Sequence, residues 1–133
     1  MSALLPSSLC GYWQSPSVAV PGEDEYFHIT KQGRLITVTA LQLPGRMMQR
    51  MPMPAWIRVE EDGFFFVCGP NRTSPGRLWE FQQVNDDQLV CLHVPTTPYR
   101  LVMHRVEWTE PPEWLAKLFA HSSEWMDRHE KSA

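Results

Sequence analysis

Hydrophobic and polar positions alternate along most of this chain in short runs, a pattern that is typical of β-strands rather than helices. Residues 26–30 and 34–43 are rich in aromatic and β-branched side chains, and Gly33 between them predicts a hairpin. Similar runs follow, separated by turn-forming residues such as Asp62-Gly63; they are residues 55–60, 64–68, 77–84, 88–94 and 99–106. The pattern predicts a mainly β fold, an antiparallel up-and-down β-barrel of eight or nine strands.

The end of the chain has a different pattern, which predicts one amphipathic α-helix over residues 111–130. Prolines and an acidic residue suit its start, and apolar side chains recur on one stripe: Trp114, Leu115, Leu118, Phe119, Trp125 and Met126. A helix of about 18 residues is marginal in water unless such a stripe is buried. The stripe must dock on the strands of its own chain or on a second chain, as a homodimer. The short connection at residues 107–109 favours the first.

Length and composition restrict the possibilities further. The chain of 133 residues is long enough for a single domain with its own core, with the barrel over residues 10–106. The formal net charge of −3 does not favour binding to nucleic acid or to an anionic membrane. No apolar run approaches the roughly 20 residues that span a bilayer. Three cysteines without a framework spacing and an N-terminus without a secretion signal indicate a reduced, cytoplasmic protein.

One short motif near the N-terminus suggests a family. A short apolar lead at residues 4–9 precedes Gly11-Tyr12-Trp13, and the predicted meander follows it. This arrangement resembles the lipocalin and fatty-acid-binding (calycin) superfamily, in which a G-x-W on the first strand places its tryptophan beneath the barrel. In that family an arginine of the last strand commonly lies across the tryptophan, and Arg105 matches it best, with Arg100 second. A guanidinium over an indole contributes roughly 1 kcal/mol.

The resemblance implies a barrel with an interior cavity for a small apolar ligand. The candidates to line that cavity are Phe27, Trp56, Phe66, Trp79 and Phe81. The alternative is that these side chains fill a closed core.

Residues 46–54 contain four methionines and two arginines, an unusual density. Methionine is flexible and polarisable, so Met47 and Met51 are candidates for a ligand portal or for a groove that binds a partner protein. The alternative is that they fill gaps at a barrel end. The prolines of this segment predict an edge strand or a loop.

No motif for catalysis or for a cofactor stands out. Serine and cysteine occur without a G-x-S-x-G context, and the acidic residues cluster in turns. Cys91 and His93 share a strand face, with Cys68 on a strand that could neighbour it, but a structural zinc site normally needs four ligands. Haem ligation by His93 or His104 is the other hypothesis for metal binding. We expect neither a metal nor a cofactor.

The sequence thus favours a non-catalytic protein that binds a small hydrophobic ligand inside a calycin-like barrel. The first alternative is a protein–protein interaction module that uses the C-terminal helix or the Met-rich edge at residues 46–53. The second alternative is a small barrel enzyme.

Overall fold

The computed structural model describes residues 7–59, 65–68, 79–93 and 100–131. These residues form a short 3-10 helix, eight β-strands and one α-helix. In chain order they are η1 (Ser7–Leu9), β1 (Gly11–Pro16), β2 (Asp24–Ile29), β3 (Arg34–Leu41), β4 (Gln49–Val59), β5 (Phe65–Cys68), β6 (Trp79–Asn85), β7 (Gln88–His93), β8 (Arg100–Val106) and α1 (Glu113–Lys131). The expected mainly β fold with one C-terminal helix is confirmed. Among the described residues, no helix is long and apolar enough to cross a membrane.

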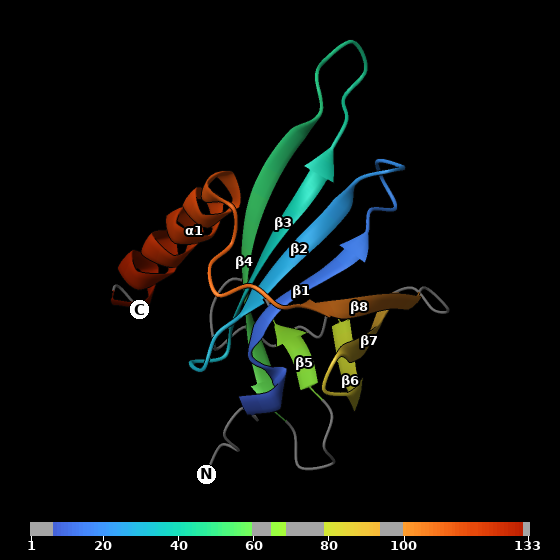
Figure 1. Ribbon diagram of the computed structural model, residues 1–133. Coiled ribbons are helices and arrows are strands. Elements are labelled where there is room, and N and C mark those ends of the chain that lie inside the picture. The colour runs from blue at the N-terminus through green and yellow to red at the C-terminus, as the bar shows by residue number, and fades with distance from the viewer. Residues whose placement is uncertain (1–6, 60–64, 69–78, 94–99, 132–133) are drawn as a thin grey trace.

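The strands form one antiparallel sheet that curls strongly. Each strand pairs with the next in the chain, and three residues of β1 also pair with β8. Figure 1 shows β1 to β4 standing as a tall layer, with β6 to β8 crossing near its lower part. The hairpin of β3 and β4 extends beyond the other strands (Figure 1). The predicted hairpin turn is present, with Gly33 at a φ of 85°.

Successive residues of β1 to β4 point alternately to the two faces of the sheet. On the concave face, which curls toward β6 to β8, lie Trp13, Phe27 and Leu35. On the convex face, which α1 covers, lie Tyr12 and Ile36. The two faces therefore belong to two separate apolar clusters.

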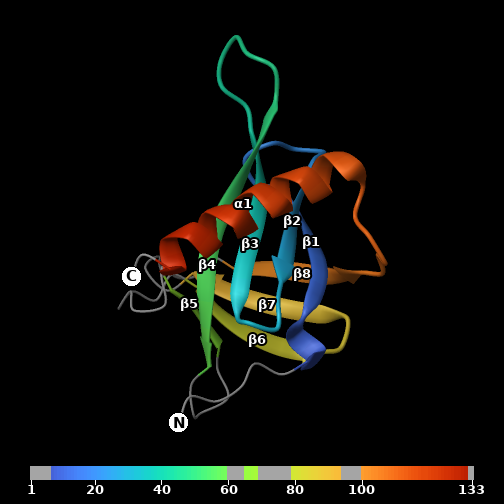
Figure 2. The same ribbon diagram turned by 90° about the vertical axis from the view of Figure 1, so that its left-hand side faces the viewer.

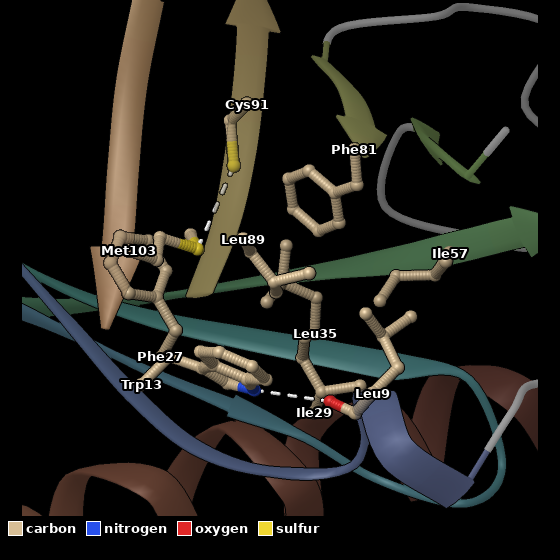
Figure 3. Packing of buried hydrophobic residues seen from close by; sticks show 10 residues of the cluster. All are labelled: Leu9, Trp13, Phe27, Ile29, Leu35, Ile57, Phe81, Leu89, Cys91 and Met103. Carbon is tan, nitrogen blue, oxygen red and sulfur yellow. Dashed lines mark hydrogen bonds between the residues drawn. The ribbon is translucent and has the colours of Figure 1, made fainter. Parts of the chain in front are cut away.

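The concave face carries the larger described cluster. Its members are Leu9, Trp13, Phe27, Ile29, Leu35, Ile57, Phe81, Leu89, Cys91 and Met103, all buried. Figure 3 shows them converging from both layers of the curled sheet. The indole Nε1 of Trp13 donates a hydrogen bond to the carbonyl of Leu9 at 3.0 Å, which ties η1 to the core (Figure 3).

The convex face is covered by α1, which lies across β2, β3 and β4 in Figure 2. Leu115, Phe119, Ser122 and Met126 are buried there, and their spacing of four, three and four residues places them on one helix face. Docking of the helix on its own chain is confirmed. The predicted stripe was partly wrong, because Trp114 lies one residue off this face and is 45% exposed.

The Met-rich segment forms an edge strand, as its prolines predicted, because among the described residues β5 pairs with β4 only from Trp56 onward. Residues 49–56 of β4 pair with β3 without a break, and Pro52 and Pro54 stand opposite Val38 and Ile36. The odd-numbered residues of β4 direct their backbone toward the β3 side, since the amide of Ile57 donates to the carbonyl of Gly33 at 2.7 Å. The prolines occupy even positions, whose N–H groups would point the other way. They therefore cost β3 no hydrogen bond.

Candidate functional site

The lower end of the concave face is fixed by Arg105 and Trp13. The guanidinium carbon of Arg105 lies 4.2 Å from the centre of the indole ring, so the contact that the sequence predicted is present. The same guanidinium donates hydrogen bonds to the carbonyls of Cys10, at 2.8 Å, and Asp86, at 2.6 Å, and also to that of Ser8. One side chain thus joins η1, the β6–β7 turn and the first and last strands.

Gly11 makes this arrangement possible. Its φ is 128°, and a Cβ atom there would lie 2.7 Å from Nη1 of Arg105. A side chain would displace a guanidinium that backbone carbonyls hold in place.

Along β1 and β2, the side chains of the concave face change from apolar to polar with distance from Trp13. Two residues beyond Trp13 on the same face is Ser15, and two residues before Phe27 is Glu25. Ser15 and Glu25 stand directly opposite each other in the β1–β2 register. Side chains opposite one another in an antiparallel pair have Cβ atoms about 5 Å apart. An apolar wall therefore ends in a pair of polar side chains.

The two polar side chains lie in different degrees of burial, and the described residues give the Ser15 hydroxyl no hydrogen-bond partner. Ser15 is 1% exposed, and its Oγ has no hydrogen-bond partner in the described structure. Glu25 is half-buried, and burial raises the pKa of its carboxyl, while the Arg50 charge acts in the opposite direction. A buried hydroxyl without a partner costs free energy, and such groups occur at sites that bind something.

The concave face is open at this end. Thr37, opposite Phe27, is half-buried, and on β4 the next side chain in that row is Met53, which is 51% exposed. Met51, one step further out on the same face, is 46% exposed and stands opposite Thr39. The face thus runs from buried aromatic rings to half-exposed methionines.

The predicted ligand-binding residues divide between several places. Phe27 and Phe81 lie in the concave cluster, and Met51 lies at its open end. Trp56 does not line the interior, because it occupies an even position of β4 and is buried beneath α1 instead. Met47 lies in the β3–β4 turn region and is 87% exposed. Phe66 belongs to β5 and Trp79 to β6, but their side chains lie outside the described residues.

The sequence analysis missed Ser15 and Glu25. The signal that could have found them is the period-2 alternation of a strand, counted from Trp13 along β1 and from Phe27 along β2. Ser15 lies beside a proline and Glu25 directly precedes the predicted strand at residues 26–30, so neither residue lies on a predicted strand.

A second concave surface lies on the other side of the sheet, between α1 and β4. It is a groove of about 840 Å³, lined by Pro52, Met53, Pro54, Lys117, Leu118, His121, Ser122 and Trp125. A smaller hollow of about 670 Å³ shares Lys117 and Leu118 with it and reaches Arg50 and Trp114. The helix and the Met-rich strand, two separate candidates in the sequence, thus line one surface.

The zinc and nucleophile hypotheses concern Cys91 and any grouping of possible metal ligands. Within them no three His, Cys, Asp or Glu side chains are grouped as a metal site. The Cys91 thiol is buried in the concave cluster and donates to Sδ of Met103 at 3.6 Å, and burial raises its pKa strongly. A protonated, inaccessible thiol is neither a nucleophile nor a ligand.

Comparison with protein-family models, curated proteins and solved structures found no match for this chain.

Proposed function

We propose that this protein binds a small hydrophobic molecule, without catalysis, against the concave face of a closed, calycin-like β-barrel. The observation that carries the proposal is the continuity of that face. Apolar side chains run from Trp13 and Phe27 in the core to half-exposed Met53 and Met51 at the open end. A solvated end on an otherwise apolar interior is where a ligand enters a barrel.

Two further features support the calycin-like assignment. Pairing of β1 with β8 brings the first and last described strands together, and Arg105 stacks on Trp13 across that pair. The proposal includes a cytoplasmic location, which the free thiol of Cys91 supports.

Native mass spectrometry of protein purified from its own host tests the proposal directly. We expect a mass above that of the bare chain, lost on denaturation, from a noncovalent small molecule. Met51→Glu places a charge on the concave face and should weaken binding of that molecule, or of an apolar fluorescent dye, by at least about tenfold. Met47→Glu, in the exposed turn region, is the matched control and should bind as the wild type does. A Met51→Glu protein that binds equally well would contradict a concave site.

The groove between α1 and β4 favours a second candidate, a protein–protein interaction module. Its lining includes Leu118 and Trp125 of α1, and exposed Trp114 lines the adjoining hollow. Large exposed apolar side chains gathered at one place are typical of surfaces that bind proteins. The homodimer expected from the helix is one form of this candidate.

The same mass spectra distinguish the two candidates. A dimer, or a complex with another chain, that His121→Glu dissociates and Met51→Glu leaves intact would favour the groove. His121 lines the groove and is exposed, so this substitution does not disturb the core.

A further inference from the structure

Ser15 and Glu25 give the concave site a chemical preference. Resting on the proposed ligand-binding function, we propose that the ligand is an amphiphile whose polar end donates hydrogen bonds, an amine or a hydroxyl, to Glu25 and Ser15. A carboxylate end would be disfavoured. The ligand's apolar body would extend toward the half-exposed Met51 and Met53.

The position of the two side chains is the first step. Both lie on the concave face, one residue pair beyond Trp13 and Phe27, which are buried in the apolar cluster. A molecule that enters from the open end, where Met51 and Met53 are half-exposed, reaches Ser15 and Glu25 before the buried ring of Trp13. Its polar end therefore meets a hydroxyl and a carboxyl side by side.

The second step is that, among the described residues, the Ser15 hydroxyl makes no hydrogen bond and the Glu25 carboxyl makes no ion pair. The Ser15 hydroxyl is buried and makes no hydrogen bond in the described structure. Among described residues Glu25 forms no ion pair, since Arg50, the cation that influences it, contacts Glu23 at 2.7 Å and the rings of Tyr26 and Trp114. A ligand donor would satisfy both groups at once.

The negative charge of the Glu25 carboxylate determines which polar end of the ligand is preferred. A carboxylate accepts hydrogen bonds and repels another carboxylate, whereas it attracts an ammonium group most strongly where water is partly excluded. The serine hydroxyl donates or accepts and completes the coordination of either an amine or an alcohol. The order of affinity should be amine, then alcohol, then carboxylate.

Dodecylamine, dodecanol and dodecanoate test this order, because they share one apolar chain and differ at the polar end. Binding is measured by calorimetry or native mass spectrometry with the full chain, at neutral to slightly alkaline pH and below micelle-forming concentrations. We expect dodecylamine to bind at least about tenfold more tightly than dodecanoate. Glu25→Gln should remove most of this difference, and Ser15→Ala should weaken binding of both dodecylamine and dodecanol.

Asp24→Asn is the matched control for Glu25→Gln. It removes the same charge one residue away, from a side chain on the opposite face of β2, and should leave the order unchanged. If dodecanoate binds as tightly as dodecylamine to the wild type, the inference is wrong and the ligand-binding function stands. The same holds if Glu25→Gln and Asp24→Asn change the order of affinity equally. If none of the three amphiphiles binds, the ligand-binding function and the inference both fail.

Discussion

At the scale of single residues, the contact between the first and last described strands depends on Gly11 and Arg105. A terminal guanidinium normally yields to a neighbour at little cost. Here carbonyls of Cys10 and Asp86 and the Trp13 ring hold it in position. The space above Gly11 is therefore closed by a group that cannot easily move.

Gly11→Ala should destabilise the fold by about 2–4 kcal/mol, combining the cost of a positive φ with displacement of the Arg105 guanidinium. Gly22→Ala is the matched control, because Gly22 also has a positive φ, 86°, but nothing lies within 4 Å of its added Cβ. Urea unfolding of both variants measures the difference. Equal losses would mean that the contact with Arg105 contributes nothing.

His28 links stability to pH. It stacks on Tyr12 at 4.3 Å between ring centres, lies 5.5 Å from Phe119 of α1, and burial lowers its pKa from the usual 6.5. The folded state thus resists the proton that the unfolded state accepts. Stability is full above pH 6.5 and falls as the pH decreases through 6.5 toward the lower folded value.

The free energy of unfolding, measured by urea at a series of pH values across this range, should decline on acidification by at most about 1.4 kcal/mol per pH unit for this group. His28→Phe keeps a ring between Tyr12 and Phe119 and should flatten that decline. His121→Gln, on the exposed side of α1, should retain the wild-type profile. A wild-type slope in His28→Phe would assign the effect to other groups.

At the scale of elements, α1 is held by packing and by charge. Its buried residues cover Ile36, Val38 and Trp56, and Arg34, which lies over Trp56, pairs with Asp127 at 2.6 Å. Asp127 is more than half exposed, so the ion pair contributes little beside the apolar contact. Packing therefore determines where the helix docks.

Leu115→Ala should cost about 2–5 kcal/mol, the range for a fully buried leucine. Trp114→Ala, at the neighbouring position, should cost less than Leu115→Ala, because the indole is 45% exposed and contacts the sheet only at its margin, near Tyr26 and Arg50. Thermal unfolding of the two variants compares them. The reverse order would mean that α1 is rotated on the sheet.

A chain ending at Thr109 tests the whole element. Without α1, the aromatic and aliphatic convex face would be in water, so we expect aggregation or strong binding of an apolar dye. A soluble, monomeric chain as stable as the full protein would instead make α1 an independent interaction arm.

At the scale of the whole molecule, the reactivity of the cysteine thiols tests both the proposed cellular compartment and the burial of each cysteine. After unfolding, all three cysteines should react as free thiols, and a disulfide would contradict the cytoplasmic proposal. In the folded protein, a short pulse of alkylating reagent should label Cys10 well before Cys91, which has no exposed surface. Mass spectrometry of the digested protein measures both.

Much of this architecture follows from local sequence signals. Alternation of apolar and polar residues predicted the strands, and the helical period predicted α1. Gly11-Tyr12-Trp13 with Arg105 predicted the contact between the first and last described strands. The predictions that failed depended on which face of the sheet each side chain occupies in the folded protein. Pro52 and Pro54 correctly predicted an edge strand, whereas Trp56 points outward only because of its parity in β4, which the local sequence does not show. Ser15 is buried only because the sheet curls around it, which the local sequence does not show either.

The position of Pro52 and Pro54 has a consequence for the protein in a crowded solution. A strand from another molecule that approached β4 on the side away from β3 would find carbonyls but no N–H group at two alternate positions. Recruitment of further strands, the first event of amyloid growth, is therefore obstructed along the segment that displays Met51 and Met53. The hairpin can keep soft, apolar side chains in contact with water without becoming a template for fibres.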